Sequence, residues 1–115
     1  MTVSDQRNHT TSHLNKYGNY QAPVRELIIA HGNLELTIWV FGTADGFVAN
    51  ISATTSIGGF YGPSTSKETH YSSETEAILA AIAKFRKRAE YYILFRECLT
   101  TLKQHLAAER QQSLF

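Results

Sequence analysis

Four basic residues within five positions form the densest charge run of the chain: Lys84, Arg86, Lys87 and Arg88. On a helix, Lys84, Lys87 and Arg88 would share one flank. Basic side chains gathered on one face are typical contacts to nucleic-acid phosphates. The same composition is typical of a solvated outer helix face, which is the interpretation we favour. The run therefore predicts a nucleic-acid-binding module as an alternative function.

The segment 58–71 is rich in glycine, serine and threonine and is a second place where chemistry is conceivable. Its glycines resemble a phosphate-cradling loop, although they do not have the spacing of the established nucleotide-binding motifs. The segment leads towards a predicted helix N-terminus, where backbone N–H groups can hold an anion. Glu74 and Glu76 at that terminus would repel one. Small-ligand or anion binding at 58–71 is therefore a second alternative.

Side chains suited to nucleophilic or metal chemistry occur without the context that such chemistry needs. Residues 64–70 include two serines, a glutamate and a histidine, but no G-x-S-x-G nucleophile motif accompanies them. His9 and His13 have the helical spacing of a metal pair, in a segment without a helical pattern. We therefore predict no catalytic residue, no metal site and no cofactor, and a protein that is not an enzyme.

Three runs of β-type sequence are expected to form an antiparallel meander. Val24–His31 and Leu34–Phe41 flank Gly32-Asn33, which is a two-residue hairpin signal. With His31 opposite Leu34, one sheet face becomes entirely apolar and predicts the core. Its members are Leu27, Ile29, Leu36, Ile38 and Val40, followed by Phe47, Ala49, Ile51 and Ala53 from the third run, Phe47–Thr54. Phe60-Tyr61 is a candidate fourth strand.

A long helical segment follows. Ser73 and Glu76 form a capping-box pattern, and neither glycine nor proline interrupts the chain from there to about residue 112. The apolar stripe turns by roughly a quarter of a circle near Leu94 if one ideal helix runs throughout. The sequence thus predicts an α+β fold, with a three- to four-stranded antiparallel β-meander and a long C-terminal helix, kinked or broken, packed on one sheet face.

The expected domain organisation is simple. Residues 1–22 are polar and without strand or helical periodicity, which predicts a flexible N-terminal arm. Residues 23–115 form a single α+β domain with the sheet over about 24–61, a loop over 62–72 and the helical segment over about 73–112.

The sheet face opposite the predicted core is also apolar, although an open sheet face is usually polar. We therefore predict a partner-binding strip there. Its members are Ile28, Trp39, Phe41 and Val48. The alternative left open is that the N-terminal arm folds over this strip with Leu14, Tyr17 and Tyr20.

The apolar residues in the second half of the helix point away from the face that covers the sheet. They are Phe95, Leu99, Leu102 and Leu106. Two copies packed symmetrically would bury them, which predicts a homo-oligomer, most simply a dimer. The alternative is a helix break near Leu94, after which a second helix folds back onto the same chain.

Composition limits the broad class of the protein. The net charge of +1 gives no overall preference for nucleic acid or membrane, although residues 23–80 sum to −4 (two basic, six acidic) and 81–115 to +4 (seven basic, three acidic). The single cysteine favours a reducing, cytoplasmic location, and no segment approaches the length of a membrane span. Our preferred expectation is a non-enzymatic binding or regulatory domain that is homo-oligomeric through its C-terminal helix and binds a macromolecular partner such as a protein, as an accessory protein of a phage or plasmid.

Overall fold

The Gly32-Asn33 turn organises the sheet in the computed structural model, which describes residues 1–112. It joins β4 (Arg25–His31) to β5 (Leu34–Thr43). Gly32 has a φ of 60°, a left-handed conformation that glycine adopts without strain. His31 pairs with Leu34 and Ile29 with Leu36, so the predicted register is confirmed.

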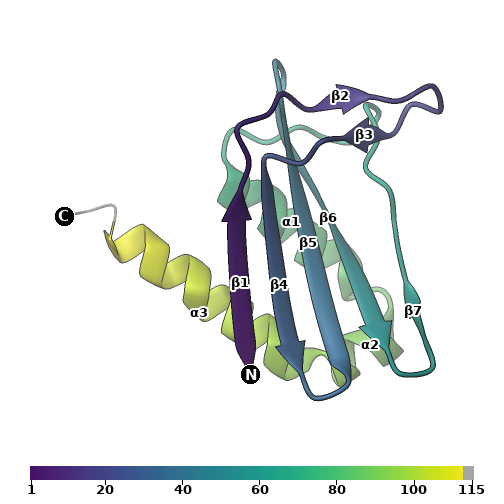
Figure 1. Ribbon diagram of the computed structural model, residues 1–115, viewed down its shortest axis with the longest axis vertical. Helices are drawn as coiled ribbons and strands as arrows, with labels where there is room; N and C mark the ends of the chain where they lie inside the picture. The colour runs from purple at the N-terminus through teal and green to yellow at the C-terminus, as the bar shows by residue number, and fades with distance from the viewer. Residues whose placement is uncertain (113–115) are drawn as a thin grey trace.

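The meander continues through β6 (Gly46–Thr55) and the short β7 (Gly58–Phe60). Within residues 1–112, the large sheet has five strands in the order β1-β4-β5-β6-β7 (Figure 1). β1 (Thr2–Arg7) pairs antiparallel with β4, which corrects the expectation of a flexible arm over residues 1–22. All six residues of β1 are exposed. Because neither face of β1 is buried, its sequence does not alternate between apolar and polar residues, which is the pattern by which strands are predicted.

The helices lie on one face of the large sheet (Figure 1). α1 (Glu74–Phe85) packs on β5 and β6, and α3 (Arg96–Gln112) packs on β4. Ser73 caps α1 by accepting a hydrogen bond from the Glu76 N–H at 3.1 Å, as the capping pattern predicts. The predicted α+β class is therefore confirmed. None of the helices within residues 1–112 is long and apolar enough to cross a membrane.

The helical segment is broken twice. α1 ends at Phe85, the chain turns through residues 86–88, and the short α2 (Ala89–Leu94) precedes α3. Phe95 lies between α2 and α3 and is fully buried. These turns rotate α3 so that its apolar face meets the sheet.

The residues expected to form an oligomer interface therefore lie in the core of their own chain. Their exposed fractions do not exceed 5%, and they pack with the sheet and α1 residues: Phe95, Leu99, Leu102 and Leu106. The geometric argument for self-association through them is wrong, because the break supplies the intrachain partner that a continuous helix would lack. The fold-back alternative describes this part of the structure.

The N-terminal segment covers part of the other sheet face. β2 (His13–Leu14) and β3 (Tyr20–Gln21) form a small separate sheet. Tyr20 packs on Phe41 with ring centroids 5.9 Å apart, and both are buried. Leu14 and Tyr17, which were also expected to cover this face, are exposed.

Candidate ligand-binding pocket

A gap in the outer edge of β6 leaves a pocket that has apolar walls and charged side chains at its rim. Pairing with β7 covers Ala53–Thr55, and the next contact along this edge is the bridge from Phe47 to Tyr71. Between these points no strand within residues 1–112 pairs with the outer edge of β6. The loop after β7 and the last turns of α1 lie beside it instead. They enclose a cavity of about 110 Å³, which we call the Asn50 pocket.

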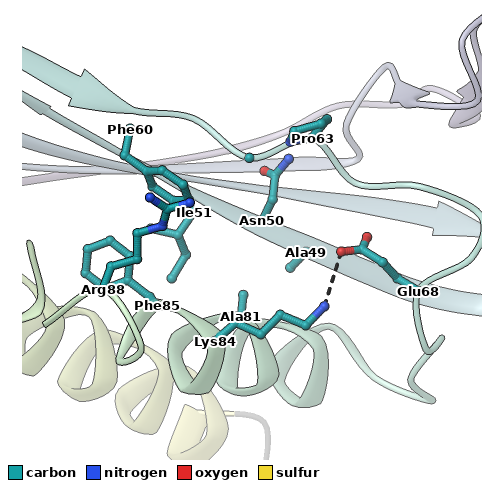
Figure 2. Close-up of a pocket in the computed structure, with 11 residues that line it drawn as sticks. Ala49, Asn50, Ile51, Phe60, Pro63, Glu68, Ala81, Lys84, Phe85 and Arg88 are labelled. Atoms are coloured by element: carbon teal, nitrogen blue, oxygen red, sulfur yellow. Dashed lines mark hydrogen bonds and ion pairs between the residues drawn. The ribbon is translucent and has the colours of Figure 1, made fainter.

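The walls of the Asn50 pocket are mainly apolar and come from three elements. β6 contributes Ala49 and Ile51, and α1 contributes Ala81 and Phe85. Phe60 at the end of β7 forms the remaining aromatic wall, 6.5 Å from the Phe85 ring between centroids. Figure 2 shows these side chains around the edge of the sheet. A cavity of this kind accepts an apolar or aromatic group of small size.

Asn50 borders the pocket, with its amide turned to the other face of the sheet. It pairs with Trp39 across the sheet, so its side chain leaves β6 on the face opposite the helices. The loop carrying Pro63 passes over that face and encloses the amide (Figure 2). Asn50 is 8% exposed, and neither its Nδ2 nor its Oδ1 has a hydrogen-bond partner within residues 1–112. Buried side-chain amides are normally paired, so this one requires an explanation.

Two cationic side chains stand at the rim. Lys84 Nζ lies 3.2 Å from Glu68 Oε1, and the lysine side chain is 64% exposed. The Arg88 guanidinium lies over the Phe60 ring, 3.9 Å from its centroid. Both interactions are visible in Figure 2. An exposed ion pair of this kind contributes little stability, so Lys84 can change partners easily.

The basic run is only partly gathered in one place. Because α1 ends at Phe85, Lys87 and Arg88 lie in the turn before α2 and not on a shared helix flank with Lys84. Lys84, Lys87 and Arg88 nevertheless line a second, shallower hollow that shares Phe60 with the Asn50 pocket. Arg86 lies over the Tyr92 ring at 5.5 Å and lines neither hollow. Lys84 and Arg88 of the basic run thus border the same cavity as part of the loop 58–71, although the two were predicted as separate sites.

The predicted partner-binding strip is divided. Phe41 and Val48 are buried beneath Tyr20, as the alternative interpretation expected. Trp39 remains half-buried, with its Nε1 donating to Glu26 at 2.7 Å and its ring 5.5 Å from that of Tyr61. Ile28 is also partly exposed. The exposed remainder of the strip is thus smaller than the sequence predicted.

The histidine and glutamate of the loop have partners elsewhere, whereas the buried Ser64 hydroxyl has no hydrogen-bond partner within residues 1–112. The Nε2 of His70 lies 2.9 Å from the Tyr20 hydroxyl. Glu68 accepts a hydrogen bond from the Thr65 N–H in addition to its pair with Lys84. Within residues 1–112, no group of three or more potential ligand side chains is placed to hold a metal ion.

A buried ion cluster lies towards the other edge of the large sheet, at β1 and β4. Arg25 is 1% exposed and donates to Asp5 through Nε and Nη2, at 3.0 and 2.7 Å. It also donates to Glu109 at 2.6 Å and to Glu74 at 3.3 Å. These partners come from β1, α3 and α1, so the cluster fastens three elements to β4. We call it the Arg25 cluster.

These contacts shift the pKa values of Asp5 and Arg25 in the Arg25 cluster. Burial raises the pKa of Asp5, but hydrogen bonds from Arg25 and His105 outweigh it and bring the pKa down to about 2. Burial lowers the pKa of Arg25, and its bonds to Asp5 and Glu109 raise it well above its usual range. Arg7 joins the cluster through contacts of 3.0 Å to Glu74 and 2.8 Å to Glu109. The cluster has a structural role, since its charges pair with one another.

Comparison with known proteins adds no assignment, because no family model, curated protein or solved structure matches this chain. Asn50 carries no signal in the sequence, because it falls at an outward position of the third strand among Val48, Ser52 and Thr54. A polar residue is ordinary there. Its significance depends on the loop that covers it.

Proposed function

We propose that the protein is a binding domain, and not an enzyme, whose ligand occupies the Asn50 pocket. The observation that carries the proposal is the buried Asn50 amide, which has no hydrogen-bond partner for either polar atom within residues 1–112. Leaving such a group unpaired costs about 1–3 kcal/mol. A ligand that displaces the loop carrying Pro63 and supplies both a donor and an acceptor would recover that free energy on binding.

The surroundings of Asn50 define the chemistry of the ligand. The walls formed by Ile51, Phe60 and Phe85 favour an apolar or aromatic body. Lys84 and Arg88 at the rim favour a negative charge next to that body. The ligand class supported best is therefore a small anionic compound, or a unit of a polymer, that carries a polar edge on a ring or chain.

A protein partner and homo-oligomerisation stay predictions. The exposed remainder of the strip, at Ile28 and Trp39, is where a partner protein would dock. Self-association would need a surface other than the buried face of α3. A cytoplasmic location likewise stays a prediction.

The proposal is tested by thermal shift with a panel of nucleoside monophosphates, amino acids, dipeptides and dicarboxylic acids. The wild type is expected to gain thermal stability with at least one class, because a ligand of the native state stabilises it by mass action. An Asn50→Leu variant is expected to lose that gain. Thr54→Leu places the same side chain at an exposed position on the same face of β6 and serves as the control. The proposal fails if the whole panel is inactive or if Asn50→Leu responds as the wild type does.

A further inference from the structure

We infer that two copies of this chain pair through β1, so that their large sheets join across a twofold axis into one continuous sheet. The inference goes beyond the Asn50 pocket and does not depend on it. It supplies the surface for self-association that the buried face of α3 cannot supply. Two features carry it: the open edge of β1, and the last turns of α3, which continue past that edge (Figure 1).

The outer edge of β1 presents unpaired backbone groups. β1 is the last strand of the large sheet, and within residues 1–112 only β4 pairs with it. Neighbouring residues of a strand direct their N–H and C=O groups to opposite edges. Asn8, directly after β1, donates its N–H to the Val24 carbonyl at 3.0 Å, so the even-numbered residues bond to β4. The N–H and C=O groups of Val3, Asp5 and Arg7 therefore point outwards.

This edge lacks the usual protection against a second strand. Edge strands are normally guarded by proline, lysine, a bulge or an inward-pointing charge. β1 contains neither proline nor lysine, and its residues pair with β4 without a bulge. Its two charged side chains, Asp5 and Arg7, turn to the helix side and are neutralised within the Arg25 cluster. The opposite side carries Thr2, Ser4 and Gln6, whose neutral side chains can meet copies of themselves.

The last turns of α3 reach beyond β1 and leave a place for one more strand. β1 contacts α3 through Asp5 and His105 at 2.8 Å and through Arg7 and Glu109 at 2.8 Å. From there the helix continues outside the edge of the sheet, with no strand of residues 1–112 in front of it (Figure 1). Val3, on the helix side of β1, is 38% exposed. A strand added at this edge would lie over these turns and cover Val3.

A second copy fits this place better than an unrelated extended peptide. A twofold axis beside β1 sets each β1 over the projecting α3 turns of the other copy, so both helices are covered at once. A peptide would leave a new open edge, whereas twofold pairing leaves none there.

The outward groups allow two twofold registers. With Ser4 on the axis, Val3 faces Asp5 of the second copy. With Asp5 on the axis, two carboxylates face each other, which is unfavourable. We therefore expect the register centred on Ser4.

The test measures the oligomeric state by sedimentation equilibrium and the exchange of backbone amides by NMR. We expect a dimer in which the outward amides of Asp5 and Arg7 become protected from exchange as the protein concentration rises. Ser4→Lys places two like charges on the axis and should weaken dimerisation by about tenfold or more. Ser4→Glu should do the same, and an equimolar mixture of the two variants should dimerise again. Thr54→Lys, exposed on the same sheet face but on β6, is the control.

A second variant separates backbone pairing from charge. Val3→Pro removes one outward N–H without breaking a bond to β4, and edge strands tolerate proline in that orientation. It should also weaken the dimer, with the circular dichroism spectrum of the folded chain retained.

The outcomes decide the inference independently of the Asn50 pocket. Loss of the dimer in folded Ser4→Lys, together with its recovery in the mixture, supports it. A wild type that stays monomeric at all accessible concentrations overturns it, even if the edge then pairs with a strand of another protein. A dimer that withstands both Ser4→Lys and Val3→Pro, or that leaves the Asp5 and Arg7 amides unprotected, also overturns it, because another surface then joins the copies.

Discussion

Replacing Asn50 by leucine is expected to make the unliganded protein more stable. The two side chains are similar in size, and leucine removes two buried polar atoms that have no hydrogen-bond partner within residues 1–112. Each unpaired polar group costs about 1–3 kcal/mol. Treating the amide as one unpaired group, we expect a gain of about 1–3 kcal/mol. Leucine beside Trp39, the cross-strand neighbour, adds an apolar contact.

Urea and thermal unfolding followed by circular dichroism would measure this gain. A gain of 1 kcal/mol raises the melting temperature by about 4 °C in a domain of this size. Ser52→Ala is the matched control on the same face of β6, because the Ser52 hydroxyl donates to the Phe60 carbonyl at 3.1 Å. Losing that paired group should lower the free energy of unfolding by about 1 kcal/mol. The two substitutions should therefore have opposite signs.

The reasoning is refuted if Asn50→Leu lowers the free energy of unfolding by about 1 kcal/mol or more. That result would mean that ordered water already satisfies the amide in the free protein. The argument that the amide awaits a ligand would then lose its basis.

Three further expectations follow from the packing. Arg25→Met should cost about 3 kcal/mol in urea unfolding, near the lower limit for breaking a buried ion pair, and a cost below 1 kcal/mol would contradict the role given to the cluster. Asp5 has a pKa of about 2 when folded, against an ordinary value of 3.8, so it contributes stability above about pH 4 that is lost as the pH falls towards 2, by about 1 kcal/mol in total once solvent screening of this partly exposed group is included. Asp5→Asn should flatten the acid limb of the stability curve, and an unchanged limb would exclude Asp5 as its source. The double variant Leu99→Glu, Leu102→Glu should unfold the chain; a folded variant that changes only its sedimentation would instead support the oligomer interface.

Most of the sheet could be predicted because its information is local. The hairpin at Gly32-Asn33 sets the register of its two strands, and the alternation of β6 continues it. β1 could not be predicted because its exposed side chains show no apolar–polar alternation. Its pairing with β4 depends on backbone groups, which the sequence does not specify. The helix break at residues 86–88 has no glycine or proline to mark it. The rotation of the apolar stripe was the only sequence feature that indicated the helix break, and the same feature was also compatible with a dimer.

The candidate site was harder to predict because it is assembled from segments that are distant in sequence. The basic run and the loop 58–71 were both singled out, but their meeting at one cavity depends on where α1 ends. Arg25 occupies the core face in the predicted register, yet the carboxylates that neutralise it lie 20, 49 and 84 residues away along the chain. Asn50 gave no signal in the alternation of its strand. The roles of Arg25 and Asn50 both depend on burial by segments that are distant in the sequence.

The same separations make the Arg25 cluster a late event in folding. The meander from β4 to β6 forms through short hairpins, and short loop closures are fast. Glu109 lies on α3, so we expect it to reach Arg25 only after α3 has docked, with Arg25 still solvated when the hairpins close. Interactions that are absent from the transition state act on the unfolding rate and leave the folding rate unchanged. The Arg25 cluster therefore governs how long the native state persists, while the hairpins govern how quickly it is reached.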